Sequence, residues 1–287
     1  SSAGSNAGWE RYTSSIWRAN AMSGQYFGFS RFPFGRDLNP RDLLDLPGAK
    51  EMRSSLNYVA SRRLFGVFTG SVGEGKNTIA RWFVEELPQA KYKPLYLHDS
   101  ELTPRDLYWE YLNQLGVKPR FYRRDAKRQL NTILIDMAEG QGKIPVVIIG
   151  EAHLLSHQML EEIRFLTDFG MDSYSPMSLV LIGQTELLPA LARPSLFAIA
   201  QRVNVRYHLP YFEPDETAQH ISHHLKVAGV SATLFTEEAV KVIYEATQGA
   251  ARAIGSLCSC CLLHAMSIGA QLVDDHAVKV VLEDEYR

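Results

Sequence analysis

A glycine-rich turn between an apolar run and a helical pattern is the feature that most constrains this chain. Residues 64–69 are a short apolar run, and residues 79–84 begin a segment with helical spacing of apolar side chains. The turn between them reads Gly70, Ser71, Val72, Gly73, Glu74, Gly75, Lys76, Asn77, Thr78. Where a strand passes through such a turn into a helix, successive backbone N–H groups point at an anion. The pattern therefore predicts a phosphate-binding loop (P-loop), with Lys76 reaching the phosphates of ATP or ADP.

The turn departs from the usual P-loop pattern at one position. That pattern has Ser or Thr after the lysine, and its hydroxyl binds Mg²⁺. Here the position holds Asn77. Because an amide oxygen is a neutral and bulkier ligand than a hydroxyl, we expect Asn77 to be a weak Mg²⁺ ligand at best.

A second acidic element is expected at the end of a neighbouring buried strand. Residues 144–149 are continuously apolar, as in a strand buried on both faces of a parallel sheet, and Gly150 and Glu151 follow them. A P-loop enzyme needs an Asp here to hold Mg²⁺ and a Glu to orient or deprotonate the attacking water. The Glu is present as Glu151, and the Asp is replaced by Gly150. We therefore expect nucleotide binding to persist better than hydrolysis, with feeble turnover. Both a natural weak ATPase and a chain altered to trap one nucleotide state fit these substitutions.

Strands and helices alternate along the chain as far as about residue 211. Apolar runs at 93–99, 144–149, 179–184 and 203–209 alternate with helical patterns, which predicts a three-layer α/β domain. Beyond a proline-containing junction near residue 212, only helical patterns follow. The predicted domains are a tag-like or disordered leader at 1–21, a nucleotide-binding α/β domain with an N-terminal lead-in at 22–211, and a helical domain at 212–287.

Composition excludes several classes of protein. The apolar fraction of 46% and the charged fraction of 22% are ordinary for a soluble globular protein. The net charge is −2, so any contact with nucleic acid must come from a local patch. No apolar run approaches membrane-spanning length. The three cysteines are clustered at 258, 260 and 261, which is not a disulfide framework, and a cytoplasmic location is expected.

The motifs together resemble those of AAA+ ATPases in the ExeA/TniB group, which includes secretion-associated ATPases and target-site ATPases of mobile elements. The resemblance runs from about Tyr26 to Leu282. In addition to the P-loop, it rests on Tyr26–Phe29 with Pro33 and Phe34, Glu151–Leu155, Leu181–Leu187, Gln201–Val203 and Gly249–Arg252.

This resemblance implies an ASCE-type AAA+ fold, with a five-stranded parallel sheet flanked by helices and a C-terminal helical lid. It implies that Gln184 is sensor 1, which positions the attacking water. It also implies that Arg202 is an arginine finger acting in trans and that Arg252 is sensor 2 on the lid. A finger in trans requires a homo-oligomer, either a ring or a filament. Taken alone, each arginine also fits a solvated or ion-paired surface residue.

A second candidate site lies between residues 118 and 128, where six cations and two aromatic residues occur within eleven positions. Such a cluster could bind the phosphate backbone of duplex DNA without reading its sequence. The alternative is a solubilising helix face. The candidate DNA-binding residues are Lys118, Arg120, Arg123, Arg124, Lys127 and Arg128.

The leading functional hypothesis is a DNA-associated, ATP-dependent regulator of transposition that binds target DNA and recruits a transposase or integrase. One alternative is a secretion-system assembly ATPase of the ExeA type. Another is a catalytically silent, nucleotide-gated scaffold, for which Asn77 and Gly150 are the motivation.

Overall fold

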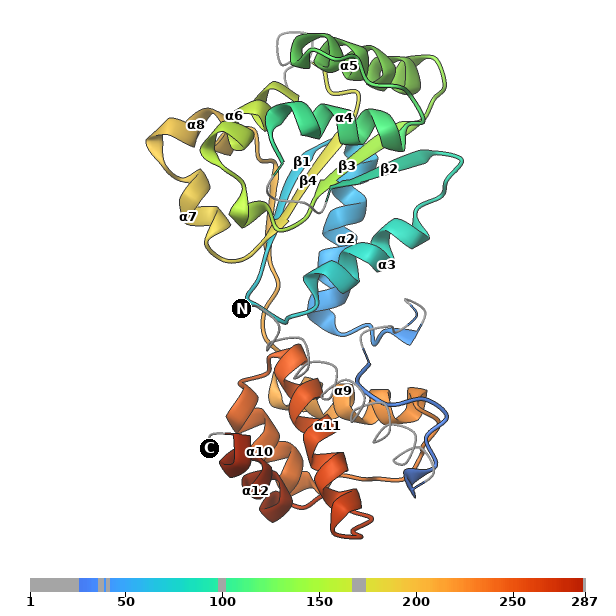
Figure 1. The fold of residues 1–287 in the computed structure, drawn as a ribbon, viewed down its shortest axis with the longest axis vertical. Coiled ribbons are helices and arrows are strands. Elements are labelled where there is room, and N and C mark those ends of the chain that lie inside the picture. The colour runs from blue at the N-terminus through green and yellow to red at the C-terminus, as the bar shows by residue number, and fades with distance from the viewer. Residues whose placement is uncertain (1–25, 36–38, 40–41, 98–101, 167–173, 286–287) are drawn as a thin grey trace, which may run out of the picture. The chain divides into compact units, whose positions relative to one another are not determined.

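Five parallel strands form the sheet at the centre of residues 45–210, in the order β2–β3–β4–β1–β5 (Figure 1). The computed structural model describes residues 26–35, 39, 42–97, 102–166 and 174–285. The expected leader at 1–21 lies outside these residues. The strands are β1 (Phe65–Thr69), β2 (Tyr92–Leu97), β3 (Ile144–Ile149), β4 (Ser178–Gly183) and β5 (Val205–His208). The predicted parallel α/β sheet is thus confirmed.

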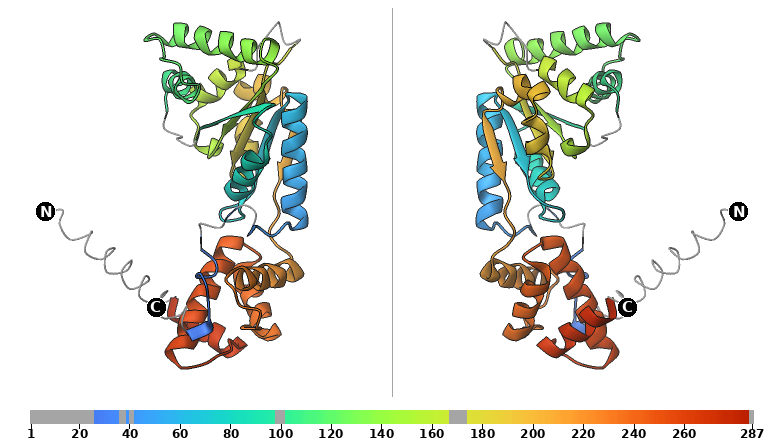
Figure 2. Two further views of the ribbon diagram at one scale, coloured as in Figure 1. Left: turned by 90° about the vertical axis from the view of Figure 1, so that its right-hand side faces the viewer. Right: turned by 90° about the vertical axis from the view of Figure 1, so that its left-hand side faces the viewer.

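Helices cover both faces of this sheet, giving the three expected layers (Figures 1 and 2). On one face lie α2 (Pro47–Arg62) and α3 (Lys76–Glu86). The other face is covered by α4 (Pro104–Gln114), α5 (Arg123–Glu139), the 3-10 turn η2 (Ala152–Leu154), α6 (His157–Leu166), α7 (Leu187–Leu191), the 3-10 turn η3 (Pro194–Leu196) and α8 (Phe197–Ala200).

The central strands are buried along their whole length because both faces are covered. Every residue of β1, β3 and β4 is buried. Successive side chains of a strand point to opposite faces. In β3, Val147 and Ile149 join the core beneath α4 and α6, whereas Val146 and Ile148 join the core beneath α2 and α3. The continuous apolar run that marked this strand in the sequence reflects two separate cores.

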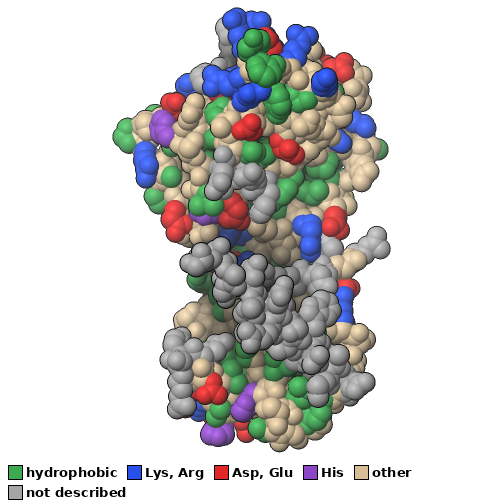
Figure 3. Space-filling model, in the orientation of Figure 1, with side chains coloured by type: hydrophobic (Ala, Val, Ile, Leu, Met, Phe, Trp, Pro, Cys, Tyr) green, Lys and Arg blue, Asp and Glu red, His purple; other side chains and the backbone are tan. Residues whose placement is uncertain are grey.

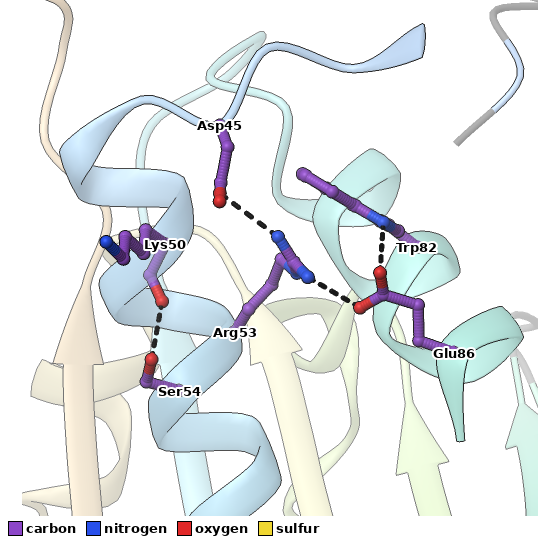
Figure 4. Close-up of polar contacts among 6 residues, drawn as sticks. All are labelled: Asp45, Lys50, Arg53, Ser54, Trp82 and Glu86. Carbon is purple, nitrogen blue, oxygen red and sulfur yellow. Dashed lines mark hydrogen bonds and ion pairs between the residues drawn. The ribbon is translucent and has the colours of Figure 1, made fainter. Parts of the chain in front are cut away.

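Arg53 ties α2 to α3, the helix that begins at the P-loop (Figure 4). Its guanidinium lies 3.5 Å from the centroid of the Trp82 ring and pairs with Asp45 at 3.0 Å and with Glu86 at 2.6 Å. The Trp82 indole N–H donates to Glu86 at 2.9 Å. One arginine therefore holds a ring and two carboxylates together, which fixes α3 against α2.

A second compact unit comprises the described residues of 26–44 and 211–285. Its helices are α9 (Pro214–Val227), α10 (Glu237–Thr247), α11 (Ala251–Ser267) and α12 (Asp275–Glu285). Each corresponds to a helical pattern read from the sequence. Cys258 and Cys261 are fully buried in the core of this unit, and burial raises the pKa of the Cys258 thiol.

The aromatic lead-in, residues 26–34, packs in this helical unit. The domain boundaries predicted from the sequence grouped it with the α/β domain. Phe27 and Phe29 are buried among the side chains of α9–α12. Ser30 donates from its backbone N–H and from its hydroxyl to the Ala228 carbonyl, at 2.8 and 2.9 Å, and the Phe34 ring stacks on His224. The helical unit is therefore assembled from both ends of the chain.

Within the described residues, no helix is long and apolar enough to span a bilayer.

We predict that Arg53→Ala destabilises the α/β unit by about 1–2 kcal/mol. The two carboxylates are half exposed, so solvent screens their pairing, and the stacked Trp82 ring supplies much of the loss. Thermal unfolding should show the decrease, and Lys50→Ala, a substitution of an exposed cation on the same helix, should have little effect. Equal stability of the two variants would contradict this account of the contact.

Candidate nucleotide-binding site

The loop between β1 and α3 has the backbone geometry of a phosphate cradle. Gly73 and Gly75 adopt φ angles of 86° and 91°, a conformation that favours glycine because it has no Cβ. Gly75 is the N-cap of α3, and no side chain of the described residues caps this helix. The N–H groups of its first turn, at the positive end of the helix dipole, are therefore available to an anion.

Lys76 is the first residue of α3 and lies over the start of the loop. Its ammonium group donates hydrogen bonds to the carbonyl oxygens of Gly70, at 2.7 Å, and Ser71. Both contacts lie within the loop, so the lysine charge is held at the cradle. Binding of nucleotide phosphates by this loop and its lysine stays a prediction from the sequence.

Glu74 turns inward beneath the loop instead of facing solvent. Only 4% of its surface is exposed, and neither carboxylate oxygen has a hydrogen-bond partner among the described residues. The backbone amide and the hydroxyl of Ser71 lie nearby and lower the pKa of this carboxyl. A Cβ on Gly70 would lie 2.0 Å from Glu74 Oε2, which explains the glycine there. Burial raises the pKa of the Glu74 carboxyl, and the charges of Lys76 and His208 offset only part of this rise.

The predicted acidic element lies at the same edge of the sheet as the P-loop. Gly150 and Glu151 directly follow β3, and β4 lies between β3 and β1. Glu151 has φ 47° and ψ 34°, a left-handed conformation that is uncommon for a residue with a side chain. Across the end of β4, its Oε1 accepts a hydrogen bond of 2.9 Å from the side-chain amide of Asn77. The structure thus brings the two predicted residues into contact.

These residues are a poor set of ligands for Mg²⁺. The Asn77 nitrogen faces Glu151, Gly150 has no side chain, and Glu74 is buried beneath the loop. Among the described residues, no group of three or more His, Cys, Asp or Glu side chains could hold a metal. Mg²⁺ prefers octahedral oxygen coordination with carboxylate ligands. The site therefore fits a nucleotide better than it fits a metal.

His153 is a residue of this site to which the sequence analysis assigned no role. Its Nδ1 accepts a hydrogen bond of 3.3 Å from the backbone N–H of Gln184, at the end of β4, so Nδ1 carries no proton. The same nitrogen lies 3.9 Å from Glu151 Oε2. His153 thus bonds the segment that contains Gln184, and its unprotonated Nδ1 forms no ion pair with Glu151. The sequence signal that could have assigned His153 to this site is its position two residues after Glu151.

The two predicted arginines are not brought to the P-loop by any described contact. Arg202 donates from Nη1 to the Arg164 carbonyl at 2.7 Å, which caps the C-terminal end of α6. Arg252 is an exposed residue of α11, in the helical unit. The arginine-finger and sensor 2 roles therefore remain predictions.

The basic segment, residues 118–128, connects α4 to α5 and includes the first turns of α5. Its loop is held by the side chain of Gln129, which bonds the Arg120 N–H at 3.1 Å and the Lys118 carbonyl at 3.1 Å. The Trp109 indole also donates to the Arg120 carbonyl at 3.0 Å. Figure 3 shows Lys and Arg side chains gathered over this part of the α/β unit. The segment is therefore a fixed loop.

Two of the six cations in the basic segment are paired with a buried carboxylate. Glu162 of α6 lies 2.9 Å from Lys127 and 3.8 Å from Arg123, and it also accepts a hydrogen bond from Tyr108. Burial alone would raise the pKa of Glu162, but the bonds from Tyr108 and Lys127 outweigh burial and lower it. The exposed cations that do not contact Glu162 are Lys118, Arg120, Arg124 and Arg128.

Two aromatic rings project from the same loop. Phe121 is 67% exposed and Tyr122 is 69% exposed. The Arg105 guanidinium lies 4.6 Å from the Phe121 ring centroid and 4.4 Å from that of Trp109. The basic segment thus combines exposed cations with exposed ring faces.

A parallel sheet with this strand order, a P-loop after the central β1 and a Glu after β3 define an AAA+ nucleotide-binding fold. In agreement, residues 59–191 match the family described as AAA domain. The chain is 31% identical over 259 residues to the general secretion pathway protein A of Aeromonas hydrophila, covering 88% of this chain. It spans 46% of that relative, or about half its length.

Solved structures of low sequence identity share the fold. A structure of Drosophila ORC bound to DNA matches with a TM-score of 0.65 at 18% identity, covering 94% of this chain and 66% of that one. The Aeropyrum pernix ORC2 protein, in its ADPNP and ADP complexes, matches with a TM-score of 0.65 at 15% identity, covering 87% and 70%. The RuvB Holliday junction branch migration motor of Thermotoga maritima matches with a TM-score of 0.53 at 17% identity, covering 82% and 67%. At these identities the likeness concerns the fold alone.

We predict that Glu74→Gln stabilises the protein at pH 8 and has a smaller effect at pH 5. The raised pKa means that folding favours the protonated carboxyl, so stability is lost as pH rises through the folded-state pKa. Glutamine carries no charge and avoids this loss. Removing it should be worth about 1 kcal/mol, or roughly 2–4 °C in Tm for a domain of this size. The measurement is thermal unfolding across pH, with the exposed Glu85→Gln as control, and a pH-independent difference would contradict the prediction.

Proposed function

We propose that this protein is a nucleotide-gated AAA+ switch that acts on duplex DNA and hydrolyses ATP feebly. The observation that carries the proposal is a complete phosphate cradle beside a poor metal site. Gly73, Gly75 and Lys76 supply the elements that hold phosphates. Asn77 and Gly150 stand where Mg²⁺ ligands are expected. Binding and release of nucleotide would then matter more to the switch than rapid turnover.

The basic segment supports DNA as the partner of the switch. Two exposed cations on the loop and two on the first turns of α5 suit contacts to a phosphate backbone, and these contacts carry no sequence information. The exposed rings of Phe121 and Tyr122 add surfaces on which a base or sugar can pack. Because the net charge of the chain is −2, this local patch must supply the attraction.

The wider role we propose is regulation of transposition, with recruitment of a transposase or integrase to target DNA. Its support is the resemblance to target-site ATPases carried by the P-loop, Glu151–Leu155 and Leu181–Leu187. In this proposal the protein forms a homo-oligomer, Arg202 reaches the nucleotide of a neighbouring subunit and Arg252 reports nucleotide state. Gln184 positions the attacking water where hydrolysis occurs. The three clustered cysteines, none of which forms a disulfide among the described residues, fit a reducing cytoplasm.

A second candidate function is assembly of a secretion system. The observation that favours it is the 31% identity to general secretion pathway protein A over most of this chain. A secretion ATPase needs the nucleotide site but does not need to bind DNA. DNA binding therefore separates the two candidates, and a chain that binds nucleotide but neither DNA nor Mg²⁺ would fit the silent scaffold.

We predict that the protein binds ATP and ADP, and that Lys76→Ala weakens this binding about 10- to 100-fold. A hydrogen bond to a charged group is worth about 1.5–3 kcal/mol, which corresponds to this range. Titration with a fluorescent nucleotide in Mg²⁺ and in EDTA would measure it. Lys91→Ala, an exposed lysine outside the site, is the control. Wild-type protein that binds no nucleotide would refute the switch.

We predict that binding to duplex DNA falls steeply with salt and that Arg124→Ala/Arg128→Ala reduces the salt slope by about 2. Each phosphate contact contributes a slope of about −0.9, and the double variant removes two contacts. The measurement is fluorescence anisotropy over a series of salt concentrations.

The matched control for the DNA experiment is Lys50→Ala/Arg62→Ala, which removes two exposed cations from α2. It should leave the slope unchanged. If the two double variants have the same salt slope, the attraction to DNA does not come from the basic segment. If wild-type protein binds no DNA, the secretion candidate becomes the better account.

A further inference from the structure

The contact between Asn77 and Glu151 joins the first turn of α3 to the residue expected to activate water. Asn77 Nδ2 lies 2.9 Å from Glu151 Oε1. The two residues are 74 positions apart in the chain, and β4 separates the strands that precede them. The contact is therefore made by the fold and not by sequence proximity.

The chemistry of the pair fixes the orientation of the amide. A carboxylate accepts hydrogen bonds and donates none, so the group that faces Glu151 must be the NH₂ of Asn77. If the amide were turned over, its oxygen would face a negatively charged oxygen. The one atom of Asn77 that could bind a cation, Oδ1, is therefore the atom that does not face Glu151. In the observed geometry the amide of Asn77 is oriented to donate a hydrogen bond to Glu151 and not to coordinate a metal.

The length of the side chain also favours this contact. The hydroxyl of a serine is attached directly to Cβ, whereas the amide nitrogen of Asn77 is one bond further out. A serine at this position would leave Glu151 Oε1 without its donor. The left-handed backbone of Glu151 is an uncommon conformation for a residue with a side chain, and it coincides with the placement of the carboxylate against Asn77.

We propose that Asn77 is a positioning residue that restrains Glu151, and that it is not a ligand of Mg²⁺. With one oxygen bonded to the amide, the carboxylate is held at α3 and has one oxygen fewer with which to orient a water. The restraint keeps the bound nucleotide from being hydrolysed. This inference rests on the proposed nucleotide binding and gives a reason for Asn at a position where a hydroxyl is expected.

The restraint and the metal-ligand role predict opposite effects of Asn77→Ala. Alanine removes the donor to Glu151 and any ligand to Mg²⁺. Release of Glu151 should raise single-turnover hydrolysis about 3- to 10-fold, less than for a buried hydrogen bond to a charged group, because this bond is exposed to solvent. Loss of a ligand should instead lower hydrolysis and weaken nucleotide binding in Mg²⁺ but not in EDTA.

The experiment compares the Gly150→Asp background with and without Asn77→Ala or Asn77→Ser, since the restored carboxylate gives a measurable rate. We expect both substitutions to raise the rate, and Asn77→Ser to raise it further because its hydroxyl can bind Mg²⁺. We also expect Asn77→Ala to leave the ratio of nucleotide affinities in Mg²⁺ and EDTA unchanged. An unchanged or lower rate for Asn77→Ala would overturn the restraint.

A second measurement does not depend on nucleotide. In a double-mutant cycle of thermal unfolding, Asn77→Ala and Glu151→Ala should be non-additive by about 1–2 °C. Strictly additive losses would overturn the inference by showing that the two side chains do not interact. Failure of every variant to bind nucleotide, with non-additive unfolding, would refute the proposed function and leave the contact established.

Discussion

Parallel pairing of β1 with β4 on one side and β5 on the other is the constraint on which the site depends. In a parallel sheet the carboxyl ends of all strands lie at one edge. The P-loop, Glu151 and Gln184 come after β1, β3 and β4, so all three lie at that edge. Complete burial of β1 leaves the loop no freedom to slide, because a shift of one residue would exchange the two cores that Val67 and Phe68 occupy. The site is thus positioned by packing far below it.

The site itself combines features that oppose one another. Backbone amides and Lys76 attract phosphate, while burial beneath the same loop disfavours the charged form of the Glu74 carboxyl and raises its pKa. Asn77 faces the carboxylate that would activate water. In the function proposed above, these elements of the α/β unit favour holding a nucleotide over hydrolysing it. The helical unit, which contains Arg252, is where the sequence resemblance places the response to nucleotide.

Much of the fold followed from local pattern, and the unpredicted parts depend on contacts between distant residues. The run 144–149 marked a doubly buried strand because every one of its side chains is apolar. The P-loop was recognisable because glycines and a lysine must be adjacent in sequence to form it. By contrast, residue type alone predicts solvent exposure or other partners for the residues of three observed features. These are the Asn77–Glu151 bond, the burial of Glu74 and the pairing of Lys127 with Glu162. No periodicity could assign the aromatic lead-in to the helical unit, since Phe27 and Phe29 fit either core.

The packing of that lead-in has a consequence for how the chain folds as it is made. The core of the helical unit needs Phe27 and Phe29 from one end and Leu257 and Val278 from the other, so these two parts of one core emerge from the ribosome about 230 to 250 residues apart. The intervening α/β unit holds its own cores and can fold first, as a domain inserted into another. The first native contacts of the lead-in are with His224 of α9 and its C-cap Ala228, and the core around Phe27 and Phe29 is complete only with α11 and α12. Closing this long loop opposes formation of the helical unit and places its completion late.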